Sequence, residues 1–278
     1  MDIILKISQE LMCRQEQVAA AVKLIDEGCT IPFIARYRKE ATGSLNDEQL
    51  RTLDERLTYL RGLEDRKEKV IASIEEQGML TDELKKSILA AETLVAVEDL
   101  YRPYKPKRKT RATIAQSKGL TGLANIISLQ MTNKPIPEEA LAYVSEEKEV
   151  HSAEEAIAGA MDIIAESISD NAEYRTEIRS LTMDKGILMT TAKDPEAESV
   201  YEMYYDFSTP VRKMTGYRTL AINRGEKEKF LSVKIEAPVD EITGYLIRQV
   251  IVRDNPNTND ILRNTITDSY KRLIAPSI

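Results

Sequence analysis

The stretch from Asn46 to Gln77 reads NDEQLRTLDERLTYLRGLEDRKEKVIASIEEQ and predicts one long helix. Asn46 is a residue type that caps helix N-termini, and Gly78 follows as a stop. Leucine and isoleucine recur at a 3-4 spacing along one face, which indicates a packing seam. We expect Glu64 and Lys67 to interrupt this seam, so that its middle is more open to solvent than its two ends. The expected seam residues are Leu50, Leu53, Leu57, Leu60, Ile71 and Ile74.

Helical periodicity continues on both sides of this stretch, and only one segment alternates as a strand does. The sequence therefore predicts a mainly α protein, a multi-helix bundle with long helices and at most one or two short strands. We expect an N-terminal helical domain over 1–108, a second helical segment over 109–192 and a third over 193–278. Further helices are predicted over 2–12, 14–27, 30–38, 81–91, 93–101, 113–118, 121–131, 138–145, 152–185 with a weak point at Asp170-Asn171, 196–205, 241–252 and 259–273, and a strand over 229–235.

Charge is distributed unevenly along the 278 residues, in which 39 Lys and Arg face 46 Asp and Glu, a net charge of −7. The segment from Leu100 to Pro137 holds eight cations and no acid, so the remainder of the chain sums to −15. Global acidity argues weakly against a nucleic-acid partner, and local basicity argues for one. No apolar run reaches the roughly 20 residues of a membrane span, and the N-terminus lacks a signal-peptide pattern. We expect a cytoplasmic chain with no membrane partner.

Residues that carry enzyme chemistry are scarce. His151 is the one histidine, and Cys13 and Cys29 lack the partner ligands of a zinc site. No glycine-rich phosphate loop, nucleophile elbow or HExxH motif is present. Two cysteines in such a chain are more typical of buried thiols than of a disulfide. We therefore expect no enzyme activity, no catalytic residue, no metal site and no cofactor, with His151 on the surface.

The basic segment YRPYKPKRKTR, residues 101–111, is the strongest candidate for a nucleic-acid contact. Two prolines favour an extended, exposed strip in which cations reach phosphates and tyrosines stack on bases. Alternatively, the strip packs against acidic helices of its own domain. The candidate residues are Tyr101, Tyr104, Lys105, Lys107, Arg108, Lys109 and Arg111.

Two more segments combine cations with apolar residues. In IPFIARYRKE, residues 31–40, the candidates are Arg36, Arg38 and Lys39, although Arg36 could instead pair with Glu40 one turn later. The acid-free run from Phe207 to Gly225 contains Arg218 and Arg224, which could flank a phosphate or hold helices together.

Four motifs resemble one known family. IPFIARYRKEATGSL, LRTLDERLTYLRGLEDRK, VEDLYRPYKPKRKTRATIA and YRTLAINRGEKE occur here in the order in which similar motifs occur in the bacterial Tex family of transcription accessory proteins. The resemblance runs from about Val18 to the end of the chain and is to the N-terminal region of the family.

The resemblance implies a cytoplasmic, nucleic-acid-associated factor linked to transcription and similar to a eukaryotic transcription elongation factor. It implies a helical region with helix-turn-helix-like parts, followed in the family by an RNase-H-like domain, a helix-hairpin-helix module and an OB-fold RNA-binding domain. The pattern of none of these is recognised here, so we expect the N-terminal portion of such a protein.

The implied partners are RNA or DNA, bound electrostatically with low sequence specificity, the transcription or translation machinery, and the later domains of the same protein. A scaffold that makes no direct nucleic-acid contact is the alternative. The family commonly has Pro-Ser-His-Arg before its LAINRGE-like motif; this chain has Thr215-Gly216-Tyr217-Arg218, so a role of that histidine does not apply.

Overall fold

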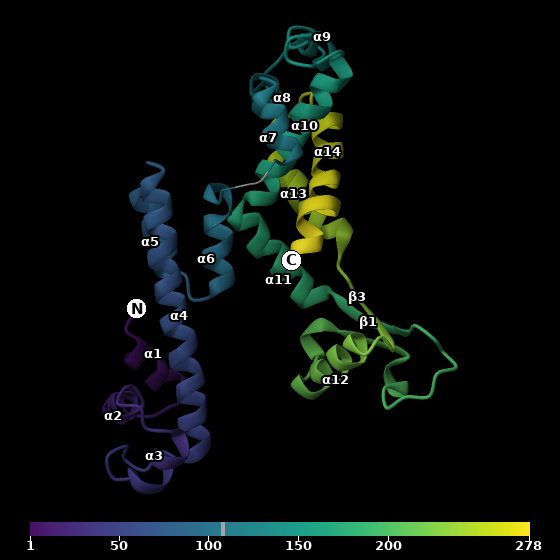
Figure 1. Cartoon of the computed structure of the whole chain (residues 1–278). Coiled ribbons are helices and arrows are strands. Elements are labelled where there is room, and N and C mark those ends of the chain that lie inside the picture. Colours follow the sequence, from purple (N-terminus) through teal and green to yellow (C-terminus); the bar gives the residue numbers. More distant parts are fainter. Residues whose placement is uncertain (107–108) are drawn as a thin grey trace. The chain divides into compact units, whose positions relative to one another are not determined.

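The computed structural model describes residues 1–106 and 109–278, which form two compact units. Unit 1 is Met1–Tyr104 and unit 2 is Lys105–Ile278. Both consist mainly of helices, which confirms the predicted mainly α class (Figure 1). Lys107 and Arg108 of the predicted basic strip lie outside the described residues.

Unit 1 is built around the predicted long helix, α4. Asn46 caps α4, because its side chain accepts a hydrogen bond from the Gln49 backbone N–H at 2.8 Å while the Gln49 side chain accepts one from the Asn46 N–H at 3.0 Å. Five shorter helices pack along α4. The helices are α1 (Ile3–Glu10), α2 (Gln15–Asp26), α3 (Ile31–Tyr37), α4 (Asp47–Glu76), α5 (Asp82–Ala90) and α6 (Leu94–Tyr101), followed by the 3-10 turn η1 (Arg102–Tyr104).

The buried seam of α4 is continuous. Five of the six predicted residues are buried, and Ile71 is half-buried. The expectation of an open middle is wrong, because Leu63, Lys67 and Val70 fill the seam between its two ends. The seam residues are Leu50, Leu53, Leu57, Leu60, Leu63, Lys67, Val70 and Ile74.

Lys67 can occupy a core position because each polar part of its side chain has a partner. The side chain is 1% exposed, and its ammonium donates to Glu64 Oε1 at 2.8 Å and to the Leu89 carbonyl at 2.9 Å. The aliphatic stem lies among the apolar seam residues. Since Leu89 belongs to α5, this one cation ties α5 to the middle of α4.

The helical part of unit 2 packs around α10. Asp170 ends α10 and Asn171 caps α11, where its side chain accepts from the Tyr174 N–H at 3.0 Å, so the predicted weak point is a real break. α10 contacts α7, α8, α9, α11 and α14. The helices are α7 (Arg111–Ser117), α8 (Thr121–Leu129), α9 (Ile136–Leu141), α10 (Ala153–Asp170), α11 (Ala172–Lys185), α13 (Val239–Val250) and α14 (Asn259–Asp268), the last continued by the π-helical η4 (Ser269–Ile274) and by η5 (Ala275–Ser277).

A small antiparallel sheet with its own core forms the rest of unit 2. β1 (Ile187–Ala192) lies between β2 (Asp206–Pro210) and β3 (Leu231–Glu236), with Thr190 opposite both Phe207 and Val233. Helix α12 (Gly216–Lys227) covers this sheet, and the turns η2 (Glu202–Tyr204) and η3 (Val211–Lys213) flank it. The core consists of Tyr201, Tyr204, Ile222 and Leu231.

The sheet is where sequence-based expectation failed most. The predicted helix over 196–205 is wrong, since only the 3-10 turn η2 forms there. The predicted strand became β3, but β1 and β2 give three strands rather than at most two. Both are short, and their strand character comes from pairing across the sheet rather than from a strong local pattern.

Among the described residues, no helix is long and apolar enough to cross a membrane.

We predict that Lys67→Ala lowers the free energy of unfolding by about 2–4 kcal/mol, because it leaves the Leu89 carbonyl without its donor and Glu64 without one partner. Lys69→Ala is the matched control, since Lys69 pairs with Asp65 in solvent, and it should cost less than about 0.5 kcal/mol. Urea unfolding followed by circular dichroism measures both. Equal effects of the two substitutions would contradict a buried role for Lys67.

We also predict that Glu64 makes unit 1 sensitive to acid. Burial raises the pKa of Glu64, but hydrogen bonds from Lys67 and from the Met1 ammonium outweigh it and hold the pKa below its ordinary value. The stabilisation is therefore present above about pH 4.3 and lost as pH falls through the lowered value. Unfolding free energies measured between pH 7 and 3 should fall less steeply in Glu64→Gln than in the wild type; identical slopes would contradict this.

Candidate nucleic-acid interface

Helix α3 exposes a pair of aromatic rings. Ile34 is buried in the core of unit 1, whereas Phe33 and Tyr37, one helical turn apart, are exposed to solvent. The two ring centroids are 5.4 Å apart, and Tyr37 is 66% exposed. The Arg38 guanidinium carbon lies 5.1 Å from the centroid of the Phe33 ring, a cation–π arrangement. The rings and this cation thus form one exposed cluster.

Three exposed cations border these rings without an acidic partner. Arg36, Arg38 and Lys39 have no carboxylate within 4 Å in the described part of the chain. The Arg36–Glu40 pair that the sequence allowed does not form, because α3 ends at Tyr37 and Arg38 leaves the helical conformation. We call the set Phe33, Arg36, Tyr37, Arg38 and Lys39 the α3 surface.

The predicted basic strip is not an extended segment with free tyrosines. Tyr101 ends α6 and is 7% exposed, its hydroxyl hydrogen-bonded to the Ser73 hydroxyl at 3.0 Å and its ring 5.4 Å from the Arg66 guanidinium. Its predicted role in stacking is therefore wrong. Pro103 stands inside the 3-10 turn η1, and Tyr104 packs half-buried against the core. The aromatic part of the strip serves the core of unit 1.

The candidate cations of the strip that the structure describes all belong to unit 2. Lys105 and Lys109 are exposed, and Arg111 is exposed at the first position of α7. Lys107 and Arg108 lie outside the described residues. Lys105, Lys109 and Arg111 are thus on the surface, as predicted.

The two candidate arginines of α12 differ in their surroundings. Arg218 is half-buried, with its guanidinium 5.7 Å from the centroids of both the Phe207 and the Tyr217 rings. Arg224 is exposed and lies 3.9 Å from Glu228, one turn later. Arg218 therefore packs on rings, whereas Arg224 faces solvent.

The rare residues of the chain are not brought together. Cys13 and Cys29 are free thiols, half-buried rather than buried, and burial raises the pKa of the Cys13 thiol. His151 is exposed before α10, as predicted, and its backbone N–H donates to Glu155 Oε2 at 2.8 Å. In the described ranges, no group of three or more His, Cys, Asp or Glu side chains could hold a metal ion.

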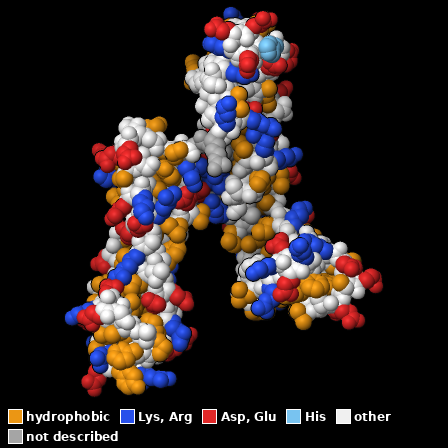
Figure 2. Space-filling view, viewed as in Figure 1, with side chains coloured by type: hydrophobic (Ala, Val, Ile, Leu, Met, Phe, Trp, Pro, Cys, Tyr) orange, Lys and Arg blue, Asp and Glu red, His pale blue; other side chains and the backbone are white. Residues whose placement is uncertain are grey.

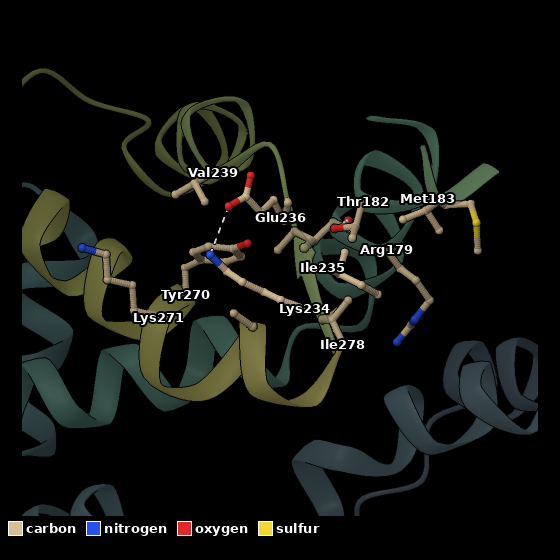
Figure 3. Close-up of a pocket in the computed structure, with 14 residues that line it drawn as sticks. Arg179, Thr182, Met183, Lys234, Ile235, Glu236, Val239, Tyr270, Lys271 and Ile278 are labelled. Carbon is tan, nitrogen blue, oxygen red and sulfur yellow. Dashed lines mark hydrogen bonds and ion pairs between the residues drawn. The ribbon is translucent and has the colours of Figure 1, made fainter. Parts of the chain in front are cut away.

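A cavity of about 590 Å³ opens in unit 2 between the end of α11, β3 and the final turns of the chain (Figure 3). Its lining is mostly apolar, and the Lys234 ammonium at its rim is bound to Glu236 at 3.1 Å. Burial raises the pKa of Tyr270, whose ring forms part of the wall. The cavity is thus mainly an apolar hollow, and it lacks the exposed rings of the α3 surface on which a base could stack.

Charges of both signs are interspersed over the face drawn in Figure 2, so no single basic face dominates it. Against this background, the α3 surface is distinguished by the combination of exposed rings with cations that no acid neutralises. Sequence reasoning found its cations and missed Phe33 and Tyr37. Helical spacing alone does not mark Tyr37 as exposed, because Tyr37 lies three residues after the buried Ile34 and so on the same side of a helix.

The motifs that carry these features match known proteins. Residues 1–75 match the model of the Tex-like protein N-terminal domain, and residues 131–272 match the Tex central region-like model. The chain is 48% identical over 276 residues to the uncharacterized protein YdcI of Bacillus subtilis, covering 98% of this chain and 38% of that protein.

More distant matches extend the comparison. The transcriptional accessory protein Tex of Neisseria gonorrhoeae is 43% identical over 261 residues, 91% of this chain and 34% of that protein. The human S1 RNA-binding domain-containing protein 1 is 29% identical over 276 residues, 93% of this chain and 27% of that protein. The chain thus spans well under half the length of each of these relatives.

We predict that replacing Tyr101 of the basic strip destabilises the protein far more than replacing Tyr37 of the α3 surface. Tyr101→Ala should cost about 3–5 kcal/mol, as expected for a buried aromatic residue. Tyr37→Ala should stay within about 0.5 kcal/mol, because the ring faces solvent. Chemical unfolding of both variants measures this. A loss in Tyr37→Ala as large as that in Tyr101→Ala would show that the α3 surface belongs to the core.

Proposed function

Since the chain belongs to the Tex-like protein family, we propose that it is a non-catalytic helical module that contacts the backbone of RNA or DNA and scaffolds further domains. The family models match residues 1–75 and 131–272. One relative, which matches 91% of this chain, is named a transcriptional accessory protein. A second relative is named for an S1 RNA-binding domain. These names support an association with nucleic acid in transcription. As part of the same proposal, we assign this role to the cytoplasm.

The observation that carries the proposal is the α3 surface. Arg36, Arg38 and Lys39 can neutralise phosphates, because no described carboxylate already neutralises them. Tyr37 offers an exposed ring on which an unpaired base can stack. Cations together with a stacking ring favour single-stranded nucleic acid and confer little sequence specificity, since every base has a π-face.

The remaining candidate cations extend this role. Lys105, Lys109 and Arg111 are exposed and would add phosphate contacts, and so would Lys107 and Arg108 of the same strip. Helix-turn-helix-like docking of the short helices α2 and α3 would be one way to present Arg36, Arg38 and Lys39. Binding through several weak phosphate contacts should depend strongly on salt.

We predict that Arg36→Glu/Arg38→Glu weakens binding of a fluorescein-labelled single-stranded oligouridylate by about tenfold or more. The salt dependence should flatten as well: the slope of log K against log salt concentration should fall by about 1.4, the share of two phosphate contacts on a single strand. Fluorescence anisotropy titrations at several salt concentrations measure both quantities.

The matched control is Lys85→Glu/Lys86→Glu, which makes the same change of charge at exposed positions of α5 in the same unit. It should lower affinity much less and leave the slope nearly unchanged. An equal loss of affinity in both variants would show that binding depends on the net charge of the protein and not on the α3 surface. Wild-type chain that binds no oligonucleotide at low salt would favour the scaffold function instead.

A further inference from the structure

The start of helix α12 exposes a second tyrosine ring. All twelve tyrosines lie in the described part of the chain, and only Tyr37 and Tyr217 are exposed, each to 66%. The other ten belong to the three hydrophobic cores or pack against them. Tyr37 is part of the α3 surface of unit 1, whereas Tyr217 lies in unit 2. An exposed tyrosine ring is therefore a rare feature of this chain, and the cores do not use the one at position 217.

An arginine lies against this ring, as one lies against the Phe33 ring in the α3 surface. The Arg218 guanidinium carbon is 5.7 Å from the centroid of the Tyr217 ring and 5.7 Å from the centroid of the Phe207 ring on β2. Phe207 is half-buried against the core of the sheet, so Arg218 links the exposed ring to the fold. Around Gly216, an added Cβ would meet nothing within 4 Å, so the space beside the ring is open.

Three cations within five residues of this ring have no acidic partner. Arg212 and Lys213 are exposed on η3, and Arg218 is half-buried. In the part of the chain that the structure describes, no carboxylate lies within 4 Å of any of the three. Other cations of this part of unit 2 do form ion pairs, namely Lys185 with Glu241, Arg224 with Glu228 and Lys234 with Glu236. We call the set Arg212, Lys213, Tyr217 and Arg218 the α12 surface.

The acids closest in sequence lie away from the α12 surface. Asp206 alternates with Phe207 along β2 and therefore projects from the opposite face of the sheet. Glu226 lies nine residues after Tyr217, about 13 Å further along α12. Between these two acids, every charged residue is a cation.

Acids on the neighbouring elements do not neutralise the α12 surface either. Asp184 is near the end of α11, against which η3 packs, and it forms no ion pair with any of the three cations. The acidic segment 194–202 borders the later part of α12, where the Tyr201 hydroxyl donates to Glu228 at 2.9 Å. A phosphate at the α12 surface would thus meet cations that are free to bind it.

We propose that the α12 surface is a second contact for single-stranded nucleic acid. A base stacks on Tyr217, phosphates bind Arg212 and Lys213, and Arg218 holds the ring in place. This inference rests on the proposed function, because it assigns the same ligand to the same combination of an exposed ring, an arginine against a ring and three unpaired cations. The two surfaces share no residue and belong to different units, so either can bind while the other fails.

Photochemical crosslinking of the whole chain to oligouridylate that contains 5-iodouridine locates the contact, because irradiated iodouracil reacts with an aromatic ring stacked on it. Mass spectrometry of the digested product should find crosslinks at Tyr217 as well as at Tyr37. Crosslinking at Tyr217 should fall about fivefold or more in Arg212→Glu/Lys213→Glu. It should stay within about threefold in Arg36→Glu/Arg38→Glu, in which crosslinking at Tyr37 falls.

Lys227→Glu/Lys229→Glu is the matched control, since it makes the same change of charge at exposed positions by the far end of α12. Crosslinking at Tyr217 should stay within about threefold in this control. The role of the ring is tested by anisotropy in the Arg36→Glu/Arg38→Glu background. There, Tyr217→Ala should weaken the remaining binding by about fivefold or more, whereas Tyr217→Phe keeps the ring and should stay within about twofold.

Three outcomes would overturn the inference. Crosslinks at Tyr37 with none at Tyr217 would remove the second contact and leave the proposed function standing. An equal loss of Tyr217 crosslinking in Arg212→Glu/Lys213→Glu and in the control would show that only net charge matters. A chain that is folded by circular dichroism yet binds no oligouridylate would overturn the proposed function, and this inference with it.

Discussion

The rest of unit 1 depends on the continuous burial of one face of α4. Each of the five shorter helices of this unit packs on that face, and none of them is long enough to be stable in water alone. Continuity requires a residue at position 67 that fills the seam, and Lys67 does so with its aliphatic stem while Glu64 and the Leu89 carbonyl satisfy its ammonium. In unit 2, α10 has the corresponding place, since five helices pack around it.

Burial of one helix face also explains which side chains the short helices α3 and α12 expose. In α3, Ile34 is buried while Phe33 and Tyr37 are exposed, next to cations that form no ion pair with a described carboxylate. In α12, burial of Ile222 and the close approach of Gly225 to Leu231 leave Leu220 and Arg224 outside. Both short helices thus have one face committed to the fold and another that the fold does not need. The exposed face of α3 combines rings with cations and suits nucleic acid.

The helical framework was accessible from the sequence because it is local. The Asn46 cap, the 3-4 spacing of the leucines and the break at Asp170-Asn171 all act within a few residues. What failed depends on partners distant in the sequence. Lys67 was expected to open the seam because its acceptor, Leu89, lies 22 residues away, and β1 and β2 become strands only by pairing with each other and with β3. Likewise, Tyr101 was assigned to a basic strip, although its hydroxyl partner, Ser73, lies 28 residues away.

Hydrogen–deuterium exchange of the chain with and without single-stranded RNA tests the central claim most directly, because it locates the contact without any substitution. The account predicts slower backbone exchange in residues 31–39 when RNA is bound, and unchanged exchange in α13, which carries none of the candidate residues. Slower exchange confined to other segments, with 31–39 unaffected, would contradict the assignment of nucleic-acid binding to the α3 surface.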